Sequence, residues 1–192
     1  MINIWLQAEK ILKKGGVVVL PTDTLYGIIG SAMSKKAVER IYDIKGRDEN
    51  KPFIVLINSL EQLKIFGIKT NQSQAKIFSK FWPGKVSVIL PCSFKKWQYV
   101  HRGENSIAFR MIGKKNKNLY NLINSVGPVV APSVNKQGEK PAENIKEAMN
   151  YFGDSIDLYI NVGKRSSPPS TLIKIKDNEV IVLRQGQTKI KI

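Results

Sequence analysis

Short apolar runs alternate with amphipathic segments along the chain, which predicts strands interleaved with helices. Val17–Leu20 is apolar without polar alternation, as expected of a strand buried on both faces, and Pro21 ends it. Residues 4–14 carry apolar side chains at helical spacing before Gly15, and a second such helix follows Ser34 as its N-cap. The same criteria predict further helices at 59–66 (with capping-box spacing), 73–81, 118–124 and 144–152, and strands at 26–30, 53–57, 86–90, 106–111, 128–131, 158–162, 170–175 and 179–183.

This order of elements predicts an α/β fold in which helices cover a sheet. The last two strands form a hairpin across Lys176–Asn178, so the sheet is mixed rather than wholly parallel. Residues 92–105 lie outside the pattern and are expected to form an irregular polar excursion. A length of 192 residues suits one domain with a sizeable core, so we expect residues 1–192 to form a single domain.

Composition excludes several classes of site. Cys92 is the only cysteine and His101 the only histidine, so the chain has no intramolecular disulfide and lacks the ligands for a Cys/His zinc site. We therefore predict no protein-held metal, a structural Cys92, and His101 as a loop residue rather than a base. The N-terminus does not read as a leader, and no apolar run approaches the ~18 residues of a membrane span, which favours a cytoplasmic protein.

The net charge of +16 points to an anionic partner, but the charge has two interpretations. The 31 basic residues are mostly lysines scattered along the chain, which is typical of a solvated surface. The alternative is a functional basic face. The few arginines are the more informative cations, because a planar guanidinium matches phosphate and carboxylate groups.

Polar residues follow or end several of the predicted apolar strands. Pro21–Thr24 follows the first strand, Ser133 and Asn135 follow a strand ended by Pro132, and Arg110 and Arg184 each close a strand. Open α/β sheets bind ligands at such strand ends. We therefore expect these four clusters to share one rim of the sheet.

Two pairs of residues spaced two apart suit a triphosphate. On extended backbone Lys45 and Arg47 would face the same way, as would Ser133 and Asn135, and cations offset phosphate charge. Compensation of a helix dipole by Lys45 and Arg47, and turn chemistry for the second pair, are the alternatives. Asp23 is either a base or a local backbone acceptor. Gly15–Gly16 precedes a strand and lacks the Gly-Lys-Ser/Thr ending, so there is no P-loop.

A set of short motifs, in this order and spacing, resembles the YrdC-type threonylcarbamoyl-AMP synthase family in its short single-domain form. The resemblance implies a YrdC-like domain, a twisted open sheet with a basic concave face. It also implies that L-threonine, bicarbonate and ATP, with Mg²⁺ assisting, give threonylcarbamoyl-AMP and pyrophosphate for the threonylcarbamoyladenosine modification of tRNA. The motifs are Pro21–Gly27, Lys45–Arg47, Lys51–Pro52, Pro83–Val86, Ile107–Arg110, Ala131–Asn135 with Gly138, Ser170–Thr171 and Leu183–Gly186.

The resemblance also implies roles for single residues. It implies that the catalytic residues are Lys45, Arg47, Ser133 and Asn135. The two cations, together with magnesium, would neutralise the departing pyrophosphate. The implied threonine pocket consists of Thr24, Tyr26, Arg110, Ala131 and Ser170, and the implied nucleotide contacts are Arg47, Lys51, Ser106, Ser133, Pro141 and Arg184.

Two rival interpretations remain open on the sequence. The basic face would also suit a non-catalytic RNA-binding module, with tRNA or another RNA as partner. Carbamoyl-adenylate chemistry on another acceptor, as in hydrogenase-maturation relatives, is disfavoured because no acylphosphatase-like or zinc-finger segment is attached. Under the enzyme interpretation we expect transient contact with the proteins that transfer the threonylcarbamoyl group to tRNA.

Overall fold

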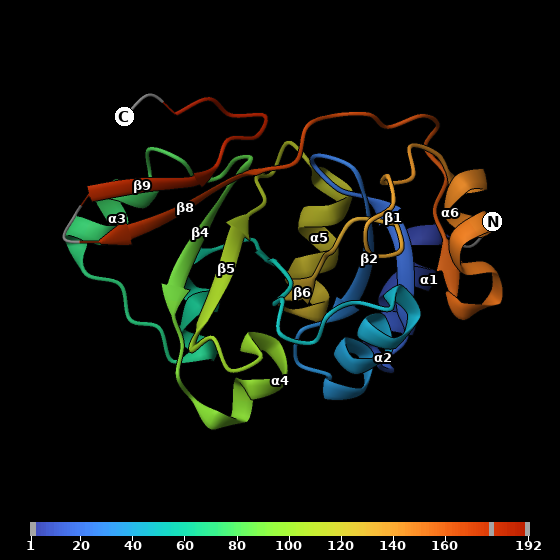
Figure 1. The fold of residues 1–192 in the computed structure, drawn as a ribbon, viewed down its shortest axis with the longest axis horizontal. Coiled ribbons are helices and arrows are strands. Elements are labelled where there is room, and N and C mark those ends of the chain that lie inside the picture. Colours follow the sequence, from blue (N-terminus) through green and yellow to red (C-terminus); the bar gives the residue numbers. More distant parts are fainter. Residues whose placement is uncertain (1–2, 177–178, 191–192) are drawn as a thin grey trace.

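Strands and helices alternate along the chain in the computed structural model, which describes residues 3–176 and 179–190 (Figure 1). The α-helices are α1 (Ile4–Lys13), α2 (Lys35–Lys45), α3 (Gln72–Phe78), α4 (Gln98–His101), α5 (Lys117–Val126) and α6 (Ile145–Phe152). Short 3₁₀ helices are η1 (Leu60–Phe66), η2 (Lys95–Trp97) and η3 (Gly153–Ser155). The strands are β1 (Val17–Pro21), β2 (Tyr26–Ser31), β3 (Val55–Ile57), β4 (Val86–Pro91), β5 (Ser106–Met111), β6 (Val129–Val130), β7 (Leu158–Tyr159), β8 (Thr171–Lys176) and β9 (Glu179–Arg184).

The described strands form one mixed sheet in the order β7-β1-β2-β6-β3-β5-β4-β8-β9. β1 pairs antiparallel with β2, whereas β3–β5 and β4–β8 are parallel pairs. β8 and β9 pair antiparallel, as the predicted hairpin requires, although positions 177 and 178 of its turn lie outside the described residues. The predicted α/β class with a mixed sheet is confirmed.

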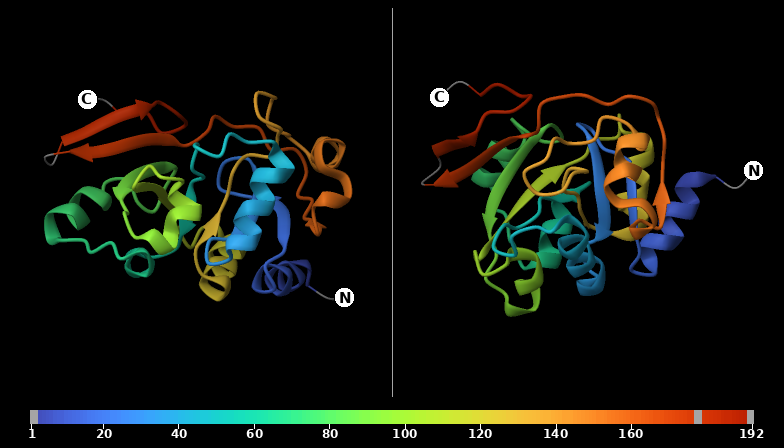
Figure 2. Two further views of the ribbon diagram at one scale, coloured as in Figure 1. Left: turned by 60° about the horizontal axis from the view of Figure 1, so that its bottom comes forward. Right: turned by 45° about the vertical axis from the view of Figure 1, so that its right-hand side comes forward.

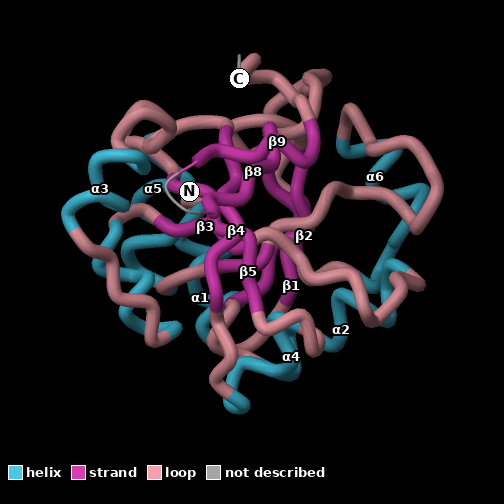
Figure 3. Tube along the Cα trace, turned by 60° about the vertical axis from the view of Figure 1, so that its left-hand side comes forward, coloured by secondary structure: helices cyan, strands magenta, loops and turns pink. Residues whose placement is uncertain are grey.

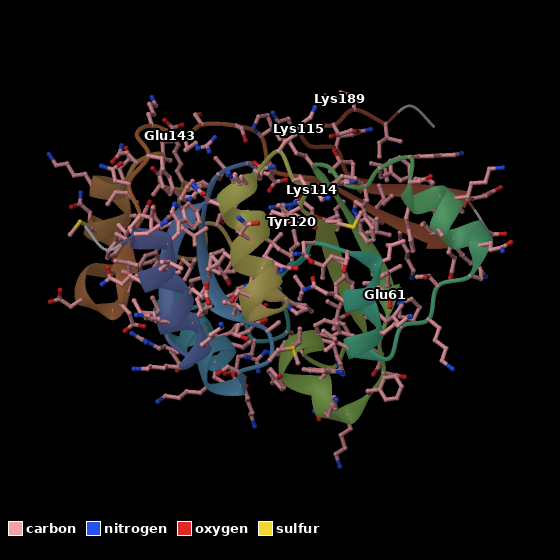
Figure 4. The ribbon with its side chains drawn as sticks, turned by 180° about the vertical axis from the view of Figure 1, so that it is seen from behind. Glu61, Lys114, Lys115, Tyr120, Glu143 and Lys189 are labelled. Carbon is pink, nitrogen blue, oxygen red and sulfur yellow. The ribbon has the colours of Figure 1, made fainter. Side chains whose placement is uncertain are left out.

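Helices cover both faces of the sheet (Figure 3), and β1 shows why its sequence has no polar alternation. Val18 and Leu20 pack in the core cluster that includes residues of α1 and α5, while Val17 and Val19 pack in the larger cluster on the other face. Seen from behind, α1 and α5 lie side by side (Figure 4). A strand with helices on both faces buries every side chain, so apolar residues occupy all of its positions.

Caps fix the ends of the helix that leads to the site. The Ser34 hydroxyl accepts a hydrogen bond from the Ala37 N–H (3.2 Å) at the start of α2, as predicted. Gly46 ends α2 in the left-handed conformation (φ 55°), which glycine adopts at little cost. The chain therefore leaves α2 with a sharp change of direction between Lys45 and Arg47.

Some predicted elements differ in the structure. Residues 60–66 form a 3₁₀ helix and Ser59 makes no side-chain cap. The Gln62 N–H donates to the Ser59 carbonyl oxygen (3.3 Å), and the Gln62 side chain accepts from the Asn58 N–H (2.9 Å). The excursion at 92–105 contains η2 and α4, and His101 is a buried helix residue rather than a loop residue.

The chain between β7 and β8 crosses the molecule. Figure 2 shows α6 and the β8–β9 hairpin at opposite ends, joined by this extended segment. The segment runs past the ends of the central strands (Figure 1).

Candidate functional site

A cavity of about 150 Å³ lies where the predicted rim clusters converge. It is lined by Thr22, Thr24, Leu25, Tyr26, Gly27, Arg47, Phe53, Ile54, Arg110, Ala131, Pro132, Ser133, Pro169, Ser170 and Arg184. All four clusters contribute to this lining: the turn after β1, Arg110, Ser133 and Arg184. The structure thus brings together residues that span more than 160 positions of the sequence.

The turn after β1 is held by its own polar groups. The Thr22 N–H and hydroxyl both donate to the Leu25 carbonyl oxygen, at 3.0 and 2.7 Å. The Thr24 N–H donates to the Thr22 hydroxyl (3.2 Å), and the two threonine hydroxyls lie 3.3 Å apart. These bonds place the Thr24 hydroxyl at the cavity.

Arg110 is paired with Asp23 below the cavity. Arg110 Nη2 lies 2.9 Å from Asp23 Oδ1, and each side chain is 5% exposed. Burial lowers the pKa of Arg110, and the Asp23 carboxylate opposes that effect. Arg110 Nε is also buried and has no hydrogen-bond partner in the described part of the chain. Asp23 is therefore an ion-pair partner at the site, which neither sequence alternative had identified.

A second arginine holds the part of the wall that contains Ser170. Arg184 Nη2 donates to the Ser170 carbonyl oxygen (2.9 Å), and burial together with the positive charge of Arg110 lowers the pKa of Arg184. The Ser170 hydroxyl lies 2.9 Å from that of Ser87, both in the interior. The Ser170 side chain and backbone are thus held from two directions.

Arg47 and Tyr26 complete the polar lining. Arg47 Nε donates to the Lys51 carbonyl oxygen (3.0 Å), and the guanidinium lies 5.2 Å from the centroid of the Phe53 ring. The Tyr26 hydroxyl donates to the Gly163 carbonyl oxygen (2.7 Å) and accepts from the Val162 N–H (3.0 Å). Tyr26 thereby anchors the segment that crosses the molecule.

Lys45 does not lie beside Arg47 at the cavity, as its spacing from Arg47 in the sequence had suggested. The expectation that Lys45 and Arg47 face one way on extended backbone is wrong, because Lys45 closes α2 and Gly46 is left-handed. The Lys45 ammonium donates to the Ser133 carbonyl oxygen (2.7 Å) and to that of Asn135, and Lys45 does not line the cavity. Burial, and next the charge of Arg47, lower the pKa of Lys45 to about 7.

The pKa of Lys45 predicts a pH dependence of stability. Its pKa is about 7 in the folded chain against an ordinary 10.5, so between these values the unfolded state binds more protons. The free energy of unfolding should therefore rise with pH across this window, by up to about 1.4 kcal/mol per unit. Urea unfolding at pH 6 to 10 measures it.

The Lys45→Met variant is the control for that measurement. Burial raises the pKa of Tyr42, Tyr99 and Cys92, whose titration acts in the opposite direction at high pH. These groups are present in both proteins, so the difference in slope isolates Lys45. Equal slopes for the two proteins would show that Lys45 is not buried as an amine.

Four further predicted site residues lie outside the cavity lining. Lys51 is exposed beside Asp48, and Ser106 begins β5, four residues before Arg110. Asn135 accepts from the Ser133 hydroxyl (2.6 Å), behind the wall that Ser133 forms. Pro141 lines a neighbouring cavity of about 840 Å³, which shares Leu25 and Pro169 with the first. The two adjoining cavities are called the inner (150 Å³) and outer (840 Å³) cavity below.

Some residues at the site were not foreseen. Ser87 is wholly buried beneath Ser170, and Phe53 supports Arg47 although it was predicted only as part of a strand. The signal for Ser87 was present: one hydroxyl interrupts the apolar run of β4. The partner of Asp23 has no such signal, because it lies 87 positions away in the sequence.

Two kinds of feature are absent from residues 3–176 and 179–190, the residues that the structure describes. No group of three or more His, Cys, Asp or Glu side chains is placed to hold a metal ion there. None of the helices described for these residues is long and apolar enough to cross a membrane.

The fold and the cavity define an α/β protein with an arginine-lined site at the strand ends of an open mixed sheet. Comparison with known proteins gives the family: the Sua5/YciO/YrdC model, described as "Telomere recombination", matches residues 10–186. The chain belongs to this family.

Individual relatives agree. The threonylcarbamoyl-AMP synthase of Pyrococcus abyssi is 30% identical over 93% of this chain and 53% of its own length. The putative threonylcarbamoyl-AMP synthase of Methanocaldococcus jannaschii is 31% identical over 95% of this chain and 86% of its own. The structure of P. abyssi Sua5 complexed with L-threonine has a TM-score of 0.84 at 28% identity, over 95% of this chain and 54% of that one. The chain therefore spans about half the length of the P. abyssi relative.

Proposed function

We propose that the chain is a threonylcarbamoyl-AMP synthase, which converts L-threonine, bicarbonate and ATP into threonylcarbamoyl-AMP and pyrophosphate. The observation that carries this proposal is the inner cavity, where hydroxyls and three arginines converge in a volume that suits a small amino acid. Membership of a family whose relatives bear this name supports it.

The inner cavity is the proposed threonine site. Thr24, Tyr26, Ala131 and Ser170 form its walls. Arg110 faces it with a guanidinium only partly satisfied by Asp23, so a substrate carboxylate would complete the set of hydrogen bonds to a buried cation. A charge-assisted bond at this depth orients the substrate strongly, because water does not compete for it.

The nucleotide would lie across the mouth of the inner cavity and in the outer one. Arg47, Ser133 and Arg184 line the inner cavity, and Pro141 lines the outer one. Lys51 and Ser106, which the family resemblance also assigns to the nucleotide, lie outside both linings and would contact it only at its periphery.

The chemistry then depends on positioning and charge. The threonine amine and bicarbonate give a carbamate with loss of water. A carbamate oxygen forms a bond to the α-phosphorus of ATP while the bond between that phosphorus and the bridging oxygen breaks, and pyrophosphate leaves. Arg47 and Arg184 offset the charge that develops on pyrophosphate, and the fixed cavity holds the reacting atoms together.

Magnesium is not assigned to a protein site in this proposal. The described residues offer no cluster of acidic, cysteine or histidine ligands for it. It would instead arrive bound to the triphosphate of ATP.

The Arg47→Met variant tests the proposal. Wild-type protein incubated with ATP, bicarbonate and labelled threonine should release pyrophosphate only when threonine is present. The variant should lose about 10²-fold or more in kcat/KM for ATP, because it removes a cation from the site of charge development. Coupled pyrophosphate detection and chromatography of the labelled adenylate measure both.

The matched control is Arg40→Met. Arg40 is a partly exposed arginine that pairs with Asp157 (2.7 Å) and does not line the cavity, so its loss should leave kcat/KM near wild type. Pyrophosphate release that does not depend on threonine would contradict the proposed function.

We further propose that residues 1–192 form a single domain. In line with this activity, we propose that the protein works in the cytoplasm, in contact with the proteins that transfer the threonylcarbamoyl group to tRNA. The rival RNA-binding module is disfavoured, because binding RNA on a basic face does not require a small cavity lined by hydroxyls and arginines. Direct contact with tRNA or another RNA would accompany the enzyme activity and would not replace it.

A further inference from the structure

Lys45 is the buried cation of the site that does not reach the cavity. It is the last residue of α2 and is only 2% exposed. Its ammonium donates to two main-chain carbonyl oxygens, those of Ser133 and Asn135, while its own carbonyl oxygen accepts from the Gln137 N–H (3.2 Å). Lys45 therefore joins α2 to the segment 131–137 through both its side chain and its backbone.

That segment forms one wall of the inner cavity. Ala131, Pro132 and Ser133 line it, and Ser133 donates through its hydroxyl to the Asn135 side chain (2.6 Å). Asn135 in turn donates to the Glu139 carbonyl oxygen (3.0 Å). The side-chain bonds of Ser133 and Asn135 thus stay within residues 133–139, whereas the Lys45 ammonium ties segment 131–137 to the helix.

Two of the three N–H donors of the ammonium are used on these carbonyls, and Lys45 lines neither cavity, so moving the ammonium into the cavity to meet a phosphate would require it to leave them. Each buried carbonyl without a partner costs on the order of 1–3 kcal/mol. Arg47 meanwhile already presents a cation to the cavity. A neutral lysine retains two N–H donors, so the two carbonyls stay bonded in either protonation state, whereas a phosphate contact depends on the charge.

We propose that Lys45 is a positioning residue: it holds segment 131–137 as the wall of the inner cavity, and so shapes the site of the small substrate rather than binding the nucleotide phosphates. The naming of that substrate as threonine rests on the proposed function. The link between Lys45 and the wall does not.

Kinetics of Lys45→Met and Arg47→Met in the full chain separate the two roles. For Lys45→Met we expect KM for threonine to rise by about tenfold or more with a lower kcat, and KM for ATP to change by less than about threefold. Arg47→Met should show the reverse order, since Arg47 lines the cavity and is the proposed contact of the nucleotide phosphates. Assays run well below the unfolding midpoint keep stability from contributing.

Hydrogen exchange supplies a readout that needs no activity. The Gln137 and Ala142 N–H groups donate to the carbonyl oxygens of Lys45 (3.2 Å) and Val134 (2.7 Å), so both amides should exchange faster in Lys45→Met. In Arg47→Met they should exchange at the wild-type rate. If wild-type protein shows no threonine-dependent turnover, the proposed function fails, and the exchange rates still decide whether Lys45 holds the wall.

The opposite pattern would overturn the proposal. A rise in KM for ATP with unchanged KM for threonine and unchanged exchange would make Lys45 a phosphate contact. Kinetic constants and exchange rates that all stay at wild-type values would show that Lys45 positions nothing.

Discussion

Replacement of Asp23 by asparagine is expected to lower the free energy of unfolding by about 3–5 kcal/mol, because it leaves the buried Arg110 guanidinium without a countercharge. The two side chains are each 5% exposed and 2.9 Å apart, so solvent cannot replace the lost carboxylate. Asparagine keeps the size of the side chain, which separates the charge from packing. Urea unfolding followed by circular dichroism measures the change.

Glu61→Gln is the matched control for Asp23→Asn. It also converts a paired acid to an amide, but the Glu61–Lys64 pair (2.6 Å) has side chains 75% and 67% exposed. Glu61 lies on the surface at η1 (Figure 4). Its loss should cost less than about 1 kcal/mol. Equal losses for the two variants would mean that the Asp23–Arg110 pair is not desolvated in solution.

Gly186→Ala is expected to distort the inner cavity, although Gly186 does not line it. A β-carbon at this position would lie 2.2 Å from the Pro169 carbonyl oxygen and 2.6 Å from the Thr171 nitrogen, both of them backbone atoms. The Gly186 N–H also donates to the Thr171 hydroxyl (2.9 Å). We expect a loss of about 1–3 kcal/mol in stability from the forced shift. Since Pro169 and Ser170 line the cavity, KM for threonine should rise about tenfold or more.

Gly153→Ala distinguishes a local effect from general destabilisation. Gly153 has positive φ (44°), so alanine is strained there, but no atom lies within 4 Å of an added β-carbon and Gly153 lines neither cavity. This variant should lose stability and keep the wild-type KM. An unchanged KM for threonine in Gly186→Ala would contradict the proposed role of Ser170 in the substrate site.

Local patterns predicted the elements well where one short-range signal decides the structure. The unbroken apolar run Val17–Leu20 is buried on both faces, and the Ser34 cap and the β8–β9 pairing follow from neighbouring residues. The capping box at Ser59 is absent because the Gln62 N–H bonds to the Ser59 carbonyl oxygen and the Gln62 side chain accepts from the N–H of Asn58 instead of that of Ser59. Spacing alone does not decide between two nearby donors for the same acceptor.

The site was harder to predict because its contacts are long-range. Strand-end clusters indicated which residues converge, and the cavity contains a member of each. Sequence does not tell where a side chain finds its partner: Asp23 meets Arg110 from a distant strand. Lys45 turned away from Arg47 because one left-handed glycine separates them, a conformation that the assumption of extended backbone overlooked.

The turn between β1 and β2 has a consequence for affinity. Thr22 uses its N–H and its hydroxyl on the same Leu25 carbonyl oxygen, and its hydroxyl also accepts from the Thr24 N–H. These bonds exist without any ligand, so the Thr24 hydroxyl is already in place when a substrate arrives. A ligand that binds there does not have to order this part of the chain. Binding therefore avoids that loss of chain entropy, and the affinity is higher than it would be for a flexible turn.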